Sequence, residues 1–344
     1  MFLFSLIGIL ELISVYSIYP FFSIILDPSI LDTNNYIIFL KNILNVDNKN
    51  LILYLGLISM TSLILVNGYF LFSYHFITKL VNLFNIELSF LVLKKNLKNN
   101  YLNMVDKNSS DITTKVNIES QRFSQGFAMS LLNILSRVVA LITLFIIAFV
   151  RSPIIVLATI TIFLFIYFVL FKILSKKLIN YGKKSSLNLT NRLNFTKESL
   201  INLKYLIVKN NIDNYLLKFK NSTINFYNSE YFKALIAIFP RFFIETIFFC
   251  FVVIILIYIN KINIDQKILI TEIVFFSIIT YRLLPNLQQI YANFTNMKYH
   301  ENLIDLFDQY LSQENVINRE SVFKNELTES IKIENLSFKF PSSN

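Results

Sequence analysis

The sequence has few of the residues from which disulfides, zinc sites and phosphate-binding loops are built. Its 344 residues include one cysteine, Cys250, and two histidines, His75 and His300. A single cysteine forms no disulfide within the chain, and so few Cys and His side chains exclude the usual four-ligand zinc sites. The five glycines form neither a G-x-G-x-x-G nor a G-x-x-x-x-G-K-[ST] pattern, so these residues contain no glycine-rich loop for nucleotide phosphates.

Charged residues are also scarce. They make up 16% of the chain, and 54% of the residues are hydrophobic, whereas soluble domains have about 25% charged and 45–50% apolar residues. The apolar residues gather in runs near 20 residues, the length of a helix that crosses a hydrocarbon core of about 30 Å. We therefore predict an all-α polytopic membrane protein. Its six transmembrane helices are expected at residues 1–26, 51–74, 127–150, 154–174, 238–259 and 268–291.

The connections between these spans differ in length. Residues 75–126 and 175–237 are too many for simple turns, and their sequence is compatible with helix, so we predict helical extensions that project tens of ångströms beyond the membrane. The other three connections are short. One of them contains residues 31–46, which are too few and too polar to cross. Their apolar residues share one helical face, which predicts an interfacial helix on the outer side.

Lysine and arginine indicate on which side of the membrane each connection lies. The two long connections and their flanks hold 20 of these residues, and the three short connections hold 5. Because cytoplasmic loops carry an excess of Lys and Arg, we place both long connections and both termini in the cytoplasm. The net charge of +10 is then explained mainly by membrane orientation, and we expect no nucleic-acid partner.

Several charged residues lie within the predicted spans, where an ionisable side chain costs on the order of 3 kcal/mol and is a functional-site candidate. We predict that some of them belong to a substrate pathway. Two of the candidates, Arg241 and Arg282, fall in the cytoplasmic half, and guanidinium groups bind phosphate bidentately. The full set of candidates is Glu11, Arg137, Arg241, Glu245 and Arg282.

Structural explanations also exist for these residues. Arg241 lies at a span boundary, where long basic side chains commonly reach lipid phosphates. Glu245 follows it by four residues, the spacing of a same-face ion pair, and Glu11 is expected to pair with an arginine on another helix. Pro285, three residues after Arg282, is a candidate hinge because proline removes its own amide and kinks a helix. Membrane helices also tolerate proline for packing alone.

The last residues alternate apolar and polar side chains. The sequence IKIENLSFKFP at residues 331–341 has period two and stops at a proline, which predicts a half-buried β-strand after a Glu/Asn/Ser-rich linker at 312–330. The pattern resembles the first strand of the nucleotide-binding domain of ABC transporters, in which an aromatic residue just before proline stacks on adenine. Phe340 occupies that position, although the family usually has tyrosine there. An arbitrary hydrophobic strand is the alternative.

The whole chain resembles the membrane half of a type I ABC exporter. Within that group it is similar to the flippase for lipid-linked oligosaccharides of bacterial protein N-glycosylation. The resemblance divides the chain into a transmembrane domain (1–311), the linker (312–330) and the start of a nucleotide-binding domain (331–344). The matching stretches are 11–22 (ELISVYSIYPFF), the outer helix near 34–44, 237–245 (AIFPRFFIE) with Cys250, and 281–285 (YRLLP).

The resemblance also implies a motor that these residues do not complete. A Walker A loop, a signature motif and a Walker B carboxylate should follow Pro341, so we expect that the chain is truncated and does not hydrolyse ATP alone. ATP and Mg²⁺ are expected as cofactors of the full-length protein. Two coupling turns that dock on nucleotide-binding domains are implied in the cytoplasmic connections. Their residues are Asn108, Ser109, Ser110 and Asp111 in the first turn, and Asn210, Asn211, Ile212, Asp213 and Tyr215 in the second.

The function implied is that of a homodimeric exporter in the bacterial inner membrane. It would move a lipid-linked oligosaccharide or a similar amphipathic glycolipid from the inner to the outer leaflet, with membrane lipid and the nucleotide-binding domain as partners. An ABC exporter of another lipid, of peptides or of drugs shares this architecture and is the main alternative. An ATP-independent membrane scaffold or a membrane enzyme is a further alternative, which leaves the ABC-like strand unexplained.

Overall fold

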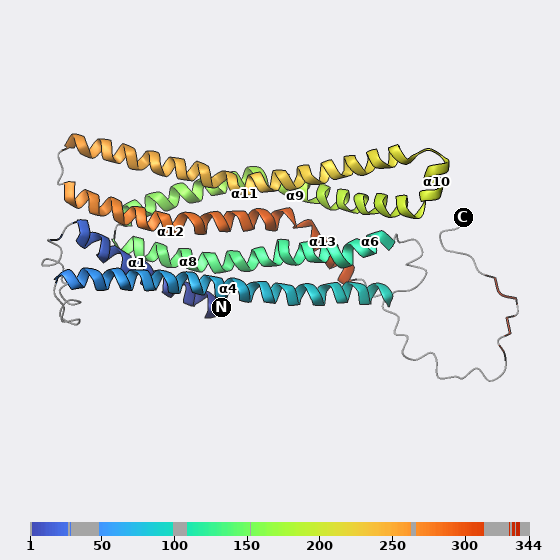
Figure 1. The fold of residues 1–344 in the computed structure, drawn as a ribbon, viewed down its shortest axis with the longest axis horizontal. Coiled ribbons are helices and arrows are strands. Elements are labelled where there is room, and N and C mark those ends of the chain that lie inside the picture. The colour runs from blue at the N-terminus through green and yellow to red at the C-terminus, as the bar shows by residue number, and fades with distance from the viewer. Residues whose placement is uncertain are drawn as a thin grey trace.

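The molecule is an elongated bundle of long helices that run nearly along one common axis (Figure 1). The computed structural model describes residues 2–26, 28, 48–98, 109–151, 153–262 and 266–312, together with 330, 332–333 and 335–337. The interfacial helix predicted at 31–46 lies outside the described residues, as do residues 313–329 of the predicted linker.

Each predicted span coincides with a helix, as expected where the backbone must satisfy its hydrogen bonds internally. The six helices concerned are α1 (Phe2–Leu26), α4 (Asn48–Leu97), α8 (Met129–Arg151), α9 (Pro153–Ile201), α11 (Ile212–Ile262) and α12 (Gln266–Tyr299). Shorter elements join or extend them. These are α6 (Ser109–Thr113), the π-helical turn η1 (Thr114–Glu119), α7 (Ser120–Arg122), the π-helical turn η2 (Phe123–Ala128), α10 (Leu203–Val208) and α13 (Asn302–Ser312).

Three helical stretches among the described residues are long and apolar enough to cross a membrane: Leu6–Ile25, Asn50–Leu97 and Ser109–Ile146. They coincide with the first three predicted spans and agree with a polytopic membrane protein. The total of six crossings, and with it the cytoplasmic position of both termini, stays a prediction.

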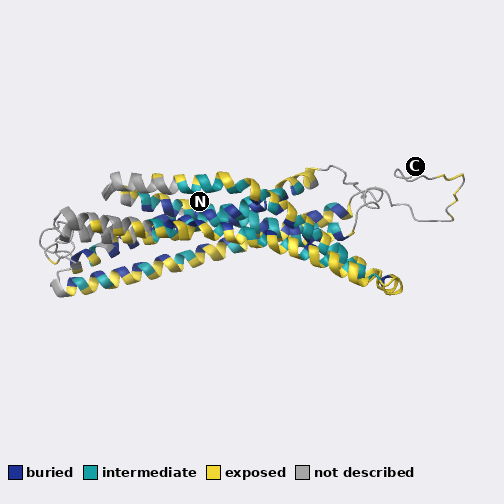
Figure 2. Ribbon diagram, turned by 90° about the horizontal axis from the view of Figure 1, so that it is seen from above, coloured by how far each residue is buried: buried dark blue, intermediate teal, exposed yellow. Residues whose placement is uncertain are grey.

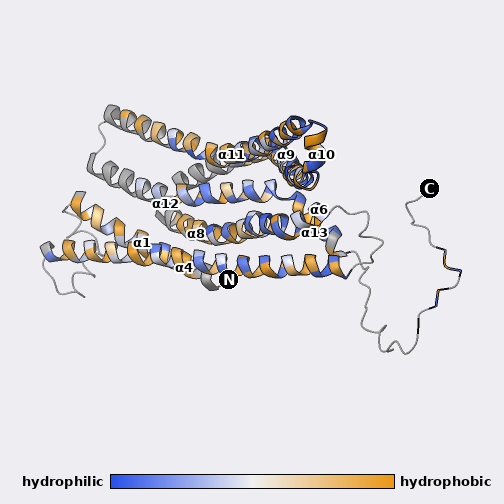
Figure 3. Cartoon of the chain, turned by 45° about the vertical axis from the view of Figure 1, so that its right-hand side comes forward, coloured by the Kyte–Doolittle hydropathy of each residue, from blue (hydrophilic) through white to orange (hydrophobic). Residues whose placement is uncertain are grey.

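Three of the helices are much longer than a bilayer is thick. α4, α9 and α11 contain 50, 49 and 51 residues, which corresponds to about 75 Å each at 1.5 Å per residue, against about 30 Å of hydrocarbon. Hydrophilic residues gather in the half of the bundle where α6, α10 and α13 lie (Figure 3). The helices therefore extend well beyond an apolar layer on that side, as the two long connections predicted.

Buried residues gather where the helices come together near the middle of the bundle, and exposed residues predominate at the end where α10 lies (Figure 2). Two charged residues are close in sequence to residues of this core. Glu11 precedes the core residue Val15 by one helical turn, and Arg282 directly precedes the core residue Leu283. Apolar packing between four helices thus fixes the helix faces that carry these charges. The cluster consists of Val15 of α1, Leu141 and Leu144 of α8, Ile244 of α11, and Leu283 and Leu287 of α12.

A second core holds the end of the bundle. α12 stops at Tyr299, and a turn at His300 and Glu301 leads into α13. Apolar side chains of α13 pack on α4 and η1, so this end of the chain is attached to the N-terminal half of the bundle. The buried members are Leu88 and Val92 of α4, Val116 of η1, and Leu303 and Phe307 of α13.

The β-strand predicted at 331–341 is absent from the residues that the structure describes there. Residues 332–333 and 335–337 are not in a strand, and Asn335 has a left-handed φ of 55° that interrupts an extended backbone. Period-two patterning produces a strand only where a neighbouring strand completes its hydrogen bonds. The prediction is therefore wrong for these residues, and Phe340 lies outside the described part of the chain.

Candidate functional site

The middle of the bundle contains a buried ion pair between its first and last long helices. Arg282 Nη1 of α12 lies 3.3 Å from Glu11 Oε2 of α1, and the two side chains are 11% and 2% exposed. A buried charge is strongly destabilising when its partner is missing. Each residue therefore stabilises the other, and the pair ties α1 to α12.

A second arginine lies beside this pair, close enough to be attracted by Glu11, and its direct contacts are with neutral side chains. Arg137 Nη1 of α8 donates a hydrogen bond to Asn286 Oδ1, 3.1 Å away, and its guanidinium carbon is 4.2 Å from the centre of the Phe70 ring. Asn286 is buried, and its Nδ2 donates to the backbone carbonyl of Arg282 at 3.0 Å. Asn286 thus connects the two arginines.

The buried cluster carries a net positive charge. Arg137, Arg282 and Glu11 together sum to +1, and among the described residues Glu11 is the acidic side chain that this cluster contains. Such an excess is unusual in an apolar environment, where charges are normally paired. The arrangement can accept an anionic group without a new cation.

Sequence reasoning found the charged members of the cluster and missed the neutral ones. Asn286 follows Arg282 by four residues, so the spacing of same-face neighbours was the available signal. Phe70 is one of 35 phenylalanines, and nothing in the sequence distinguishes it. Pro285 lies inside α12, which continues helically on both sides of it.

The other predicted pair is exposed. Arg241 Nε lies 3.9 Å from Glu245 Oε2 on α11, and the side chains are 52% and 43% exposed. Exposed pairs of this kind contribute about 0–1 kcal/mol. Within the described residues Arg241 contacts this carboxylate and the ring of Phe242, and its position at a membrane boundary stays a prediction.

The second predicted coupling turn forms the tip of the α9–α11 hairpin. α10 ends at Val208, and Asn210 adopts a left-handed φ of 48° before α11 begins at Ile212. The Asn211 amide then donates to the Leu206 carbonyl at 3.0 Å, which closes the helix end. Glycine usually fills a left-handed position of this kind, and asparagine tolerates it best among the other residues.

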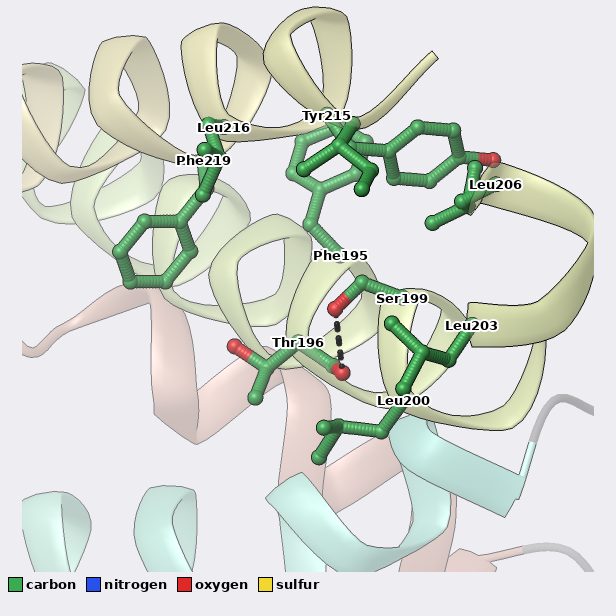
Figure 4. Close-up of a pocket in the computed structure, with 10 residues that line it drawn as sticks. Phe195, Thr196, Ser199, Leu200, Leu203, Leu206, Tyr215, Leu216 and Phe219 are labelled. Carbon is green, nitrogen blue, oxygen red and sulfur yellow. Dashed lines mark hydrogen bonds between the residues drawn. The ribbon is translucent and has the colours of Figure 1, made fainter. Parts of the chain in front are cut away.

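An apolar pocket of about 320 Å³ lies behind this tip, between the end of α9, α10 and the start of α11. In Figure 4 the side chains of Phe195, Leu203 and Tyr215 border it, and the Ser199 hydroxyl turns back to the Thr196 carbonyl at 2.9 Å. The outer surface of the tip exposes Tyr205, Ile207 and Val208. Contiguous exposed apolar side chains typically mark a surface for a partner.

The first predicted turn is described in part. α6 begins at Ser109, whose hydroxyl contacts the Lys197 ammonium of α9, and Ser110 is buried. Asp111 lies in the first turn of this helix, and Asn108 lies outside the described residues. The two predicted turns are therefore at the same end of the bundle as α13 (Figure 1).

A polar network that the sequence did not reveal lies between the core and this end. Glu230 of α11 accepts hydrogen bonds from Tyr299 Oη at 2.9 Å and from Lys233 Nζ at 2.5 Å, and Arg122 Nη2 lies 4.0 Å away. Burial raises the pKa of Glu230, but Lys233, Tyr299 and Arg122 outweigh burial, so the pKa is lowered from its ordinary 4.5. Glu230 and Lys233 are three residues apart on α11, but only the fold brings Tyr299 and Arg122 to them, because these two are far away in sequence.

Two glycines allow this network to form. A Cβ on Gly182 of α9 would overlap the backbone carbonyl of Tyr299, and a Cβ on Gly126 of η2 would overlap the ring of His300. The turn between α12 and α13 therefore lies directly against the backbones of two other helices. The described residues contain no group of three His, Cys, Asp or Glu side chains suited to a metal ion.

A comparison with protein families explains this arrangement of long helices. The family model for the ABC transporter transmembrane region matches residues 2–283. The chain belongs to this family. As an ABC transporter transmembrane region it is a membrane protein, and such regions work with a nucleotide-binding domain. The match includes Glu11, Arg137 and Arg282, together with the α10 tip.

Proposed function

We propose that this chain forms the transmembrane part of an ATP-driven exporter for an amphipathic lipid with a phosphate or pyrophosphate headgroup. A lipid-linked oligosaccharide, moved from the inner to the outer leaflet, fits best. The observation that carries the proposal is the buried cluster of Arg137, Arg282 and Glu11 with its net charge of +1. An anionic headgroup would neutralise that charge, and charge-assisted hydrogen bonds from guanidinium to phosphate are among the strong ones.

The α10 tip supports the coupling of this site to ATP. Its exposed apolar residues and the pocket behind it fit a surface that docks on a nucleotide-binding domain. ATP and Mg²⁺ would be bound by that domain, with Phe340 proposed to stack on adenine. The predicted coupling turns at 108–111 and 210–215 would transmit its movement to α9 and α11.

Two exposed stripes support the association of two copies of the chain, and we propose that this homodimer lies in the bacterial inner membrane. The α4 stripe consists of Leu83, Ile86, Phe90, Leu93 and Leu97, and all five are exposed. These residues alternate three and four apart, the spacing of a helix seam that packs on another helix. α11 exposes a second stripe with a spacing of seven, formed by Leu217, Ile224, Tyr231 and Ile238. A second copy of the chain would supply the missing helices for both stripes.

Flipping assays on the transporter assembled with its nucleotide-binding domains, in proteoliposomes, test the cargo. We expect Arg137→Gln to reduce flipping of a polyprenyl-pyrophosphate glycolipid by at least ~10-fold, equivalent to about 1.4 kcal/mol, with ATP hydrolysis in the absence of cargo unchanged. Lys79→Gln, which removes an exposed lysine of α4, is the matched control and should flip normally.

Arg282 and Glu11 form an ion pair, so a test of either residue must change both. Arg282→Gln combined with Glu11→Gln avoids an orphaned buried charge and leaves Arg137 in place, so we expect partial loss of flipping. Normal flipping by Arg137→Gln and by the double variant together would overturn the proposed site. Equal transport of a peptide or of an uncharged lipid by the unmodified transporter would favour the alternative cargo classes.

A further inference from the structure

The partner of Arg137 is an amide at a position where a carboxylate would complete a second ion pair. Asn286 Oδ1 accepts the hydrogen bond from Arg137 Nη1 at 3.1 Å. Asn286 is 4% exposed and Arg137 is partly buried, so the hydrogen bond between them is largely shielded from water on the Asn286 side. Asparagine and aspartate have nearly the same shape, so aspartate could accept the same bond and bring the cluster to zero net charge.

The neutral side chain matters because of the strength of the contact it makes. A hydrogen bond from guanidinium to an amide oxygen is weaker than one to a carboxylate, which gains from both charges. Asn286 therefore orients Arg137 without adding a second negative charge. Glu11 pairs directly with Arg282 at 3.3 Å and also attracts Arg137, so one carboxylate serves two guanidinium groups.

Asn286 also links Arg137 to the turn of α12 that contains Pro285. It follows Pro285, whose missing amide removes one backbone hydrogen bond from the helix. The Nδ2 group of Asn286 donates to the Arg282 carbonyl at 3.0 Å, across this weakened turn. A change in the bend of α12 would therefore move the oxygen that holds Arg137.

We infer that Asn286 is a specificity-determining positioning residue, which keeps the buried cluster cationic and holds Arg137 ready for a phosphate or pyrophosphate group. This inference rests on the proposed function. A neutral residue then contributes to selectivity for anionic headgroups, because it does not add the negative charge that aspartate would add at this position.

Asn286→Asp and Asn286→Ala separate charge from structure. Binding of polyprenyl pyrophosphate to the purified protein in nanodiscs should weaken at least ~10-fold in Asn286→Asp, while the melting temperature is unchanged or higher. Asn286→Ala keeps the net charge, so its affinity should fall by no more than about threefold, although its melting temperature is lower. Arg137→Gln also brings the cluster to zero and should match Asn286→Asp.

The order of the variants decides the inference. A merely structural role for Asn286 would give the opposite order, with Asn286→Ala binding more weakly than Asn286→Asp, and would overturn the inference. Inorganic pyrophosphate and polyprenyl alcohol identify the ligand. Inorganic pyrophosphate could bind as tightly as the lipid and lose this binding in Asn286→Asp. That result would support the role of Asn286 in keeping the cluster cationic, with a free anion as the ligand.

Failure of the proposed function has a different signature. Equal binding of the alcohol and the pyrophosphate lipid by the unmodified protein would overturn the anionic-headgroup site itself. Selective binding of the pyrophosphate lipid that survives Asn286→Asp unchanged would overturn only the inference about Asn286.

Discussion

His300 is a histidine that the fold keeps neutral. It lies buried in the turn between α12 and α13, and its Nδ1 donates a hydrogen bond to the backbone carbonyl of Asn296 at 2.9 Å. Burial, and then the positive charge of Arg122, lower the pKa of His300 from 6.5 to about 3, because both disfavour imidazolium. The folded protein therefore does not bind a proton that the unfolded chain binds in mild acid.

This difference predicts a loss of stability in mild acid. Between pH 6.5 and about 3 the unfolded state binds more protons at His300 than the folded state does. The free energy of unfolding should therefore fall by up to about 1.4 kcal/mol per pH unit as the pH drops. Thermal unfolding in detergent from about pH 7 to about pH 5 measures the slope, which should be smaller in His300→Asn.

The pH range of this experiment separates the effect of His300 on stability from the effect of Glu230. The lowered pKa of Glu230 contributes stability that is present above its ordinary value of 4.5 and is lost only as the pH falls below that value. Equal slopes in His300→Asn and the unmodified protein would contradict a neutral, buried His300.

At the residue scale, the sequence predicted charges better than their surroundings. Glu11 and Arg282 stand out because they interrupt apolar runs, and the structure pairs them. Asn286 and Phe70 are unremarkable residues whose importance comes from Arg137, which lies on another helix. Sequence spacing reports neighbours along one helix and carries no information on which helices touch.

At the scale of elements, the most demanding contact is that of α9 with the α12–α13 turn. Gly182 lies against the Tyr299 carbonyl, and Tyr299 is fully buried. Above this contact, Ser185 donates to Glu230 at 3.3 Å, and Arg122 Nη2 donates to Ser185 at 2.9 Å. The backbone contact joins α9 and α12, and the hydrogen bonds add α11 and α7 to the same assembly.

We expect Gly182→Ala to lower the free energy of unfolding by about 1–3 kcal/mol, because a methyl group has no room beside a backbone carbonyl. Gly68→Ala on α4 is the matched control, since a Cβ at Gly68 meets no atom within 4 Å. Alanine in an open helix position should stabilise by about 0.5–1 kcal/mol. Chemical denaturation in detergent measures both, and a neutral Gly182→Ala would contradict the close contact.

Helix positions were predictable from the sequence, and their ends were less so. Apolar runs predicted the six long helices because burial in lipid or core requires them. The turn at Asn210 was expected only from the family resemblance, and its left-handed backbone came from the structure. The break at His300 and the π-helical turns beside Arg122 depend on packing between helices. The strand was mispredicted at residues 332–333 and 335–337, the part of 331–341 that the structure describes, because the pattern gives no partner strand.

At the scale of the molecule, the stripes on α4 and α11 predict how copies associate. Ile86→Lys places a charge in the middle of the α4 stripe and should convert the proposed dimer into monomers. Leu91→Lys adds the same charge at an exposed apolar position on another face of α4 and should leave the dimer intact. Light scattering corrected for detergent measures both masses, and an unchanged mass for Ile86→Lys would contradict the α4 stripe as an interface.

The glycine contact also limits how the helices can move. Gly182 is the only glycine in α9, so a shift of α9 along its axis by one turn would bring a larger residue, Leu178 or Ser186, against the Tyr299 carbonyl. Lengthwise slippage between α9 and α12 is therefore blocked while they stay in contact. When the α9–α11 hairpin tilts, the end of α12 must therefore move with it.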